Sequence, residues 1–324
     1  MCAQPAYRGK MQIRSCSVAV REFIGEFVGT FVLMFLGEGT TANYHTVESA
    51  NDWLRLCVGW SLGVFFGILV SAKLSGAHLN LAVTVGLASI KKFDYKKIPI
   101  YFLAQLLGAF LGTSTVYGLY YGFVTSKKIP EYAWETGKNG SIGVTSAFMH
   151  ELILTGILLL VILVVIDENV CGHFHVLKIS TVVALTILCI GISFGGNTGF
   201  ALNPSRDLGA RFLSLAAYGT EAFTKDSCYF WIPLTAPVVG GVIFCQLYDK
   251  IIGPLVEMSA HDKVLAITQG HIKFRQNHSS CNAPSSFVYM GKHFGHVIFH
   301  KCKFSLMKSF EREPFLQYTS NIFC

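Results

Sequence analysis

Six apolar stretches of about 20 residues each constrain the fold of this 324-residue chain more than any other feature. A helix needs about 20 mostly apolar residues to cross the hydrocarbon core of a bilayer. Hydrophobic residues make up 52% of the chain and charged residues 14%, which is more apolar surface than one soluble core buries. The chain is therefore predicted to be an all-α, multi-pass protein of the lipid bilayer. The stretches lie at 22–42, 54–74, 98–123, 148–167, 178–196 and 230–252.

Two further apolar stretches, at about 80–90 and 203–216, are too short to span a bilayer. Each begins at an asparagine, Asn80 or Asn203, and each follows a turn that contains glycine. Irregular backbone at membrane depth is tolerated only where it is buried in protein or lines a water-filled cavity. The two stretches are therefore predicted to be re-entrant half-helices that line a pore.

The two halves of the chain repeat each other. Residues 75–80 lie over residues 198–203 at an offset of 123 positions, and the first span of each half opens with a glutamate, Glu26 or Glu151. Because each half holds three spans, an odd number, the second half must be inverted in the membrane. The predicted fold is six transmembrane helices plus two re-entrant half-helices in two inverted repeats.

Composition and charge predict the domain order and the orientation in the membrane. Lysine and arginine gather before the first span and between the second and third, which predicts that both termini are cytoplasmic. The glycosylation motif at Asn139 then lies in an extracellular loop, with its occupancy left open. The predicted parts are a cytoplasmic segment at 1–20, a channel domain at 21–256 with repeats at about 21–125 and 146–256, and a disordered cytoplasmic tail at 257–324.

The two asparagines predict the kind of solute that the pore accepts. An asparagine at a helix start accepts a backbone N–H with its side-chain oxygen, which leaves the NH₂ group as a donor in the pore. Each half-helix N-terminus adds roughly +0.5 elementary charge, so cations and hydronium meet a barrier. The predicted substrate is uncharged. The net charge of +7 comes from residues beside the spans and in the tail, so nucleic-acid binding is not predicted.

Arg206 lies inside an otherwise apolar half-helix, where an ionised side chain is costly and marks a functional site by default. Its five donors suit hydroxyl or carbonyl groups. Asp207 follows it, and Arg211 lies one helical turn beyond Asp207, so that their charges can offset each other. The alternative is that these side chains only fasten a loop, which we favour for Asp207 and Arg211 but not for Arg206.

Two segments resemble the signature loops of the major intrinsic protein family, the aquaporins. They are SGAHLNLAVT at 75–84 and GFALNPSRDLGAR at 199–211, and the resemblance covers about residues 20–253. Within the family, an aspartate directly after the filter arginine, here Arg206-Asp207, resembles the aquaglyceroporin branch. The resemblance implies a homotetramer with one pore per subunit, no cofactor, no metal ion and no turnover chemistry.

The resemblance also implies a selectivity filter made of Trp60, Gly191, Phe200 and Arg206. Gly191 stands where strict water channels carry a narrowing histidine, so it is expected to leave room. Trp60 and Phe200 would form an apolar corner for the CH groups of glycerol while Arg206 binds its hydroxyls. The implied function is a passive plasma-membrane channel for glycerol, water and other neutral solutes such as urea and polyols.

The first signature loop departs from the usual Asn-Pro-Ala triplet of the family, because Leu81 stands where proline is expected. The second loop keeps Pro204 but ends its triplet at Ser205. Leu81 can adopt helical dihedral angles, so the donor of Asn80 is expected to survive. The width of the pore and its exclusion of protons at this point are left open.

Several alternatives remain from the sequence. Glu26 and Glu151 are either proton-relay carboxylates or, as the resemblance implies and we favour, buried acceptors that hold the half-helix loops. His78 either lines the cytoplasmic vestibule or fastens its loop. The alternative functions are a nearly water-only pore, a structural or junctional protein with a closed pore, and an active transporter. His150-Glu151 lacks the second histidine of an HExxH zinc motif.

Overall fold

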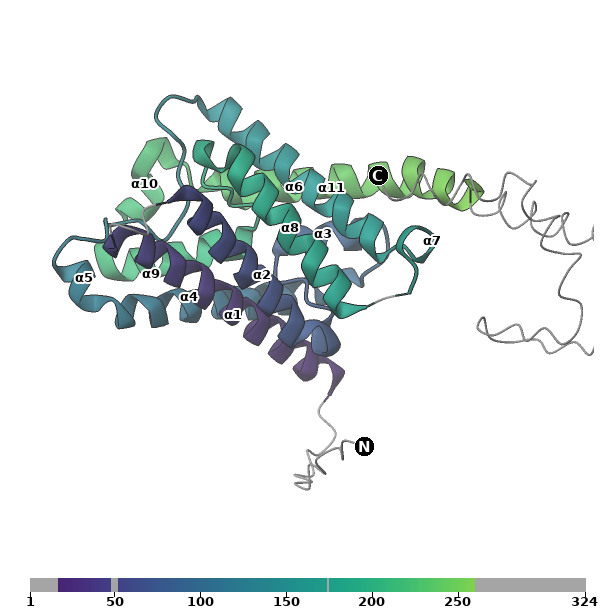
Figure 1. Ribbon diagram of the computed structural model, residues 1–324, viewed down its shortest axis with the longest axis horizontal. Helices are drawn as coiled ribbons and strands as arrows, with labels where there is room; N and C mark the ends of the chain where they lie inside the picture. The colour runs from purple at the N-terminus through teal and green to yellow at the C-terminus, as the bar shows by residue number, and fades with distance from the viewer. Residues whose placement is uncertain (1–16, 48–51, 174, 260–324) are drawn as a thin grey trace, which may run out of the picture. The chain divides into compact units, whose positions relative to one another are not determined.

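The computed structural model describes residues 17–47, 52–173 and 175–259, and this part of the chain is helical without any strand (Figure 1). The all-α prediction is therefore confirmed. The predicted tail at 257–324 lies almost wholly outside the described residues, as does most of the segment at 1–20. The elements are α1 (Val18–Thr46), α2 (Trp53–Ser75), α3 (Leu81–Ser89), η2 (Tyr95–Lys97), α4 (Ile98–Leu119), α5 (Tyr121–Thr125), α6 (Val144–Ile166), α7 (Glu168–Cys171), α8 (Val176–Phe194), η3 (Gly195–Asn197), α9 (Pro204–Tyr218), α10 (Glu221–Cys228), α11 (Trp231–Leu247) and η4 (Tyr248–Ile252).

Five helical stretches of the described chain are long and apolar enough to cross a membrane, and they lie over five of the six predicted spans. The sixth prediction, 22–42, falls within α1, a helix of 29 residues. α1 carries two wholly buried glutamates, Glu26 and Glu38, and packs along α2 and α4. The five stretches are Trp53–Ser75, Tyr95–Leu119, Val144–Ile166, Val176–Asn197 and Glu221–Ser259.

The helices pack in two matching groups. In the first half α1 lies against α2 and α4, and in the second half α6 lies against α8 and α11 (Figure 1). The half-helices exchange partners, because α3 packs on α11 and α9 packs on α4. This exchange of partners joins the two halves around α3 and α9.

Glycines allow the helices within each half to approach closely. In the first half, a Cβ at Gly67 in α2 would lie 2.7 Å from the carbonyl oxygen of Gly29 in α1. In the second half, a Cβ at Gly240 in α11 would overlap the carbonyl oxygen of Leu152 in α6.

The outer surface of the helices carries large apolar side chains. Soluble monomers rarely expose contiguous apolar surface of this kind, whereas helices in a bilayer satisfy their backbone internally and turn apolar side chains to lipid or to neighbouring subunits. The described chain is thus a multi-pass membrane protein. Examples from five helices are Leu62, Leu103, Ile153, Leu185 and Ile243, each more than two-fifths exposed.

Candidate functional site

The two signature loops share an unusual backbone conformation. Positive φ is uncommon outside glycine, yet three positions within four residues have positive φ in each loop and correspond at the offset of 123. The inverted repeat predicted from sequence is therefore present in the backbone itself. The pairs are Gly76 and Gly199 (90° and 74°), Ala77 and Phe200 (55° and 40°), and Leu79 and Leu202 (53° and 53°).

Glu26 fastens the first loop to α1. Its wholly buried carboxylate accepts hydrogen bonds from the backbone N–H groups of His78 (2.9 Å) and Leu79 (2.7 Å). It also accepts from the hydroxyl of Ser75 (2.6 Å) and from Nε2 of Gln105 (2.8 Å). These four bonds satisfy loop donors that would otherwise be orphaned in the protein interior.

Glu151 fastens the second loop in the same way. Its buried carboxylate accepts from the backbone N–H groups of Ala201 (3.0 Å) and Leu202 (2.8 Å). These two residues match His78 and Leu79 at the offset of 123. The contacts of both glutamates are those that the loop-holding alternative requires.

Asn80 and Asn203 cap the two half-helices. Oδ1 of Asn80 accepts from the backbone N–H of Ala82 (2.8 Å) at the start of α3. Oδ1 of Asn203 accepts from the backbone N–H groups of Ser205 (3.0 Å) and Arg206 (3.2 Å) at the start of α9. Each side chain is thereby fixed at the positive end of a helix.

The amide groups of the two asparagines also lock the loops together. Nδ2 of Asn80 donates to the carbonyl oxygen of Leu202 (2.8 Å), and Nδ2 of Asn203 donates to that of Leu79 (2.7 Å). From the sequence we expected each NH₂ group to be available as a donor in the pore. In the structure, one of its two hydrogens makes this cross-loop hydrogen bond. One hydrogen of each amide remains for a solute.

Leu81 begins α3 directly after Asn80, just as Pro204 begins α9. The missing proline therefore does not prevent the half-helix from starting at the same point. Leu81, Pro204 and Ser205 do not contribute to the lining of the cavity described below. Leu81 therefore does not border this cavity.

Gln105, which the sequence analysis did not single out, connects the half-helices to α1. Its wholly buried side chain accepts from the hydroxyl of Ser205 (2.8 Å) and donates to Glu26. It lies 3.2 Å from the hydroxyl of Thr84 in α3. A lone amide in the apolar stretch at 98–123 was the available signal, since buried polar side chains need partners.

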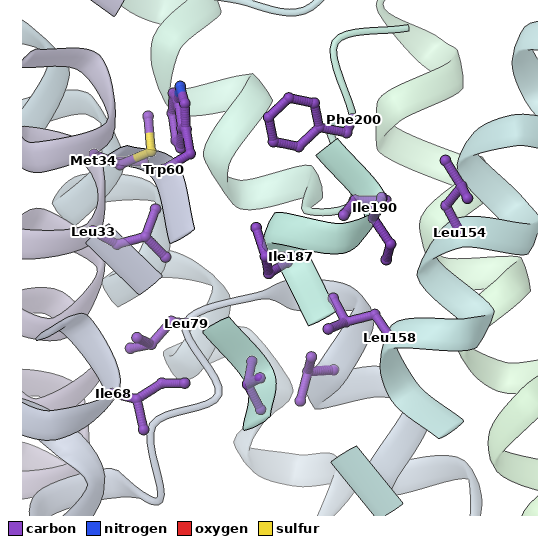
Figure 2. Close-up of a cluster of buried hydrophobic side chains, with 14 of the residues drawn as sticks. Leu33, Met34, Trp60, Ile68, Leu79, Leu154, Leu158, Ile187, Ile190 and Phe200 are labelled. Atoms are coloured by element: carbon purple, nitrogen blue, oxygen red, sulfur yellow. The ribbon is translucent and has the colours of Figure 1, made fainter. Parts of the chain in front are cut away.

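Both asparagines line a cavity of about 330 Å³. Its polar side chains are His78, Asn80, Asn203 and Arg206, and the rest of the lining is apolar. Figure 2 shows part of the apolar lining, with Trp60 and Phe200 toward one end and Leu79 and Ile68 toward the other. A few convergent polar groups in an apolar cavity are typical of a small-molecule site.

Arg206 lies against Trp60, with its Cζ atom 4.3 Å from the indole ring centroid. The indole N–H of Trp60 donates to the hydroxyl of Thr41 in α1 (3.2 Å), which fixes the ring. Among the described residues, Nη1 of Arg206 has no hydrogen-bond partner, and it lies 3.8 Å from Oδ1 of Asp207. The guanidinium is thus held by a ring face and keeps a donor free.

The side chains of Asp207 and Arg211 form hydrogen bonds that hold neighbouring segments in place, as the favoured alternative predicts. Asp207 accepts from the backbone N–H (2.8 Å) and hydroxyl (2.5 Å) of Thr136 and from Nε of Arg211 (2.5 Å). Arg211 donates to the carbonyl oxygens of Ala222 and Thr136, both at 2.6 Å. This buried pair ties the loop at Thr136 and the first turn of α10 to α9.

Gly191 lies behind Phe200 and does not line the cavity. A Cβ at Gly191 would lie 3.3 Å from Cζ of Phe200 and 2.9 Å from Sγ of Cys57. Trp53, which the sequence analysis missed, donates from its indole N–H to the carbonyl oxygen of Gly191 (2.9 Å) and meets Phe200 edge-on at 6.1 Å. Gly191 therefore leaves room for the Phe200 ring. From the sequence we had expected Gly191 to leave room in the pore itself.

His78 combines both expectations made for it. The ring lines the cavity, and its Nδ1 lies 3.2 Å from the hydroxyl of Thr84. It also packs against the rings of Phe93 and Tyr101, with centroids 4.7 and 5.1 Å away. The side chain is thus both a lining group and a fastener.

Known proteins share both the sequence and the arrangement. Residues 12–248 match the family model described as major intrinsic protein. Aquaglyceroporins of Plasmodium berghei and Plasmodium falciparum are 72% and 73% identical over 244 residues, which cover 75% of this chain and 95% of each relative. The X-ray structure of the aquaglyceroporin from Plasmodium falciparum has a TM-score of 0.73 and 74% identity, and the match covers 74% of this chain and 99% of that one. The chain belongs to the major intrinsic protein family, in its aquaglyceroporin branch.

Proposed function

We propose that this chain is a passive channel for glycerol and water that also admits other small neutral solutes such as urea and polyols. The observation that carries the proposal is the cavity in which Arg206, Asn80, Asn203 and His78 are the polar side chains of an otherwise apolar lining. Relatives named aquaglyceroporin support the same substrate class. The proposal involves no cofactor and no chemical step.

The filter in this proposal is formed by Trp60, Phe200 and Arg206, with Gly191 behind it. Trp60 and Phe200 face the hydrocarbon side of glycerol, and the guanidinium of Arg206 faces a hydroxyl. The remaining N–H groups of Asn80 and Asn203 take the next hydroxyls along the path. The charge of Arg206 and the two half-helix N-termini oppose cations and hydronium.

The setting that we propose is a homotetramer in the plasma membrane, with one pore per subunit and both termini cytoplasmic. Support comes from the exposed apolar side chains of the helices and from the four lysines between the second and third spans, Lys91, Lys92, Lys96 and Lys97. In this orientation the exposed Asn139 faces the outside. Native mass spectrometry tests the subunit number, and glycosidase treatment of the protein from cells tests Asn139.

Uptake of labelled glycerol into vesicles with and without a pH gradient tests the proposed transport mode. A passive channel equilibrates glycerol faster than empty vesicles do and reaches the same final level under either condition. Accumulation above the outside concentration would establish an active transporter instead. Uptake equal to that of empty vesicles would establish a closed, structural pore.

The Gly191→His variant is expected to reduce glycerol flux more than water flux. The new side chain must displace Phe200 or Cys57, which narrows the filter for the larger solute first. Gly118→His is the matched control, because a side chain at the exposed Gly118 meets no described neighbour within 4 Å. Unchanged glycerol flux in a well-expressed Gly191→His protein would count heavily against the filter assignment.

The Leu81→Pro variant, which restores the usual family triplet, is expected to leave both fluxes within about twofold of the original. Leu81 already occupies the first position of α3, where proline is accepted, and Asn80 has the extended backbone that precedes proline readily (φ −155°, ψ 124°). Stability should rise by up to about 1 kcal/mol through the unfolded state. Vesicle fluxes and thermal unfolding in detergent measure both effects, and a large change in the ratio of the two fluxes would show that Leu81 shapes the pore directly.

A further inference from the structure

Glu38 is a buried acid that neither the pore nor the loop network uses. It lies in α1, and its side chain is wholly inaccessible to solvent. Neither of its carboxylate oxygens has a hydrogen-bond partner among the residues that the structure describes. Glu26 on the same helix is equally buried but accepts four hydrogen bonds. An ionised carboxylate in such a place is unfavourable unless a positive charge compensates it.

The turn of α1 that carries Glu38 lies directly behind the filter tryptophan. A Cβ on the preceding residue, Gly37, would lie 2.5 Å from the Trp60 ring, so this ring packs on the α1 backbone. Thr41, three residues after Glu38, accepts the indole N–H of Trp60 at 3.2 Å. The other partner of the ring is Arg206, at 4.3 Å from its centroid. Glu38 therefore lies next to the Trp60 and Arg206 pair.

Of the charged groups near Glu38 in the described part of the chain, Arg206 is positive, whereas Glu135 and Asp207 are negative. Asp207 does not neutralise Arg206 by a hydrogen bond, because its oxygens take Thr136 and Arg211. Nη1 of Arg206 is itself buried and without a hydrogen-bond partner in the described part of the chain. Two ionisable groups without hydrogen-bond partners thus lie in one neighbourhood.

We propose that Glu38 is the buried counter-charge of Arg206 and a positioning residue of the filter. This role rests on the proposed function. In it α1 contributes to charge selectivity, because the Glu38 carboxylate lowers the positive potential that Arg206 creates in the pore. Water is the natural bridge between two such groups that do not touch directly. With Glu38 in place, the filter rejects cations without attracting anions.

The test replaces Glu38 with glutamine, which keeps the size of the side chain and removes its charge. In vesicles that hold the full chain, glycerol uptake, chloride leak and potassium leak are measured on the same preparation. Glu38→Gln is expected to raise the ratio of chloride leak to potassium leak about tenfold, since an uncompensated Arg206 makes the pore more positive. Glycerol uptake above empty vesicles shows that the channel is folded.

Glu22→Gln is the matched control, because Glu22 lies on the same helix, pairs with Lys97 at 2.8 Å and is outside the cavity. Its leak ratio should equal that of the original protein. A Glu38→Gln protein with the same ratio as the control would overturn the inference, because it would show that the buried acid is neutral. No glycerol uptake by the original protein would instead contradict the proposed function.

Glu38→Asp keeps the charge and shortens the side chain by one methylene, which guards the test against a glutamine variant that does not fold. If Glu38 acts as a counter-charge, the Glu38→Asp variant should have a ratio of chloride leak to potassium leak within about twofold of the original. A pure packing role predicts that both leaks rise together, because the lost methylene loosens the support of Trp60. Parallel rises in the two leaks would overturn the inference.

Discussion

Replacing Arg206 with alanine is expected to raise the leak of small cations and protons by roughly a hundredfold while glycerol still passes. At an effective dielectric constant of 20, a unit charge about 5 Å from the path opposes a cation by about 3 kcal/mol, which corresponds to that factor. Asp207 stays bound to Arg211 in the variant, and Glu38 loses Arg206 as a positive neighbour. The positive potential at the filter is then lower.

The measurement is the dissipation of imposed pH and potassium gradients in vesicles, together with glycerol uptake on the same sample. Arg55→Ala is the control, since Arg55 is exposed at the start of α2 and does not line the cavity. Gradients that decay equally slowly in both variants would mean that the two half-helix N-termini exclude cations without Arg206.

Replacing Glu26 with alanine is expected to destabilise the protein by about 3–5 kcal/mol, because several buried donors lose their acceptor at once. The substitution orphans the buried N–H groups of the loop at His78 and Leu79, and each such group costs about 1–3 kcal/mol. Thermal unfolding in detergent should shift downward by roughly 10 °C. Because the loop carries Asn80, the surviving protein should also lose its flux.

Two comparisons make the Glu26 experiment specific. Glu151→Ala should have a smaller effect on the unfolding temperature, because Glu151 accepts two backbone hydrogen bonds where Glu26 accepts four bonds in all. Glu22→Ala, which removes a half-buried ion pair with Lys97, should have almost none. Equal shifts for Glu26→Ala and Glu22→Ala would refute the loop-holding role.

The fold could be predicted from the sequence because its signals are local. The length of an apolar stretch decides whether it spans, and Asn80 and Asn203 mark helix starts through caps that form within three residues. The inverted repeat followed from counting spans between two similar loops. The equal φ angles at Leu79 and Leu202 are the structural counterpart of that sequence symmetry.

The parts of the site that were missed depend on contacts between distant segments. Gln105, Trp53 and Glu38 lie in apolar helices, and nothing in their immediate sequence says which loop or ring they will meet. Gly191 was assigned to the filter by resemblance to a family position, and the resemblance does not say whether Gly191 borders the path or supports Phe200. The cross-loop bonds of the asparagines likewise appear only once the halves are brought together.

The cavity bordered by Trp60, Phe200 and Arg206 is expected to conduct glycerol as well as water. The most direct test is to measure both permeabilities side by side, by light scattering, on one preparation of vesicles that contain the purified protein. Osmotic water flow and glycerol entry are both expected to exceed those of empty vesicles. Fast water flow with glycerol entry no faster than in empty vesicles would contradict it.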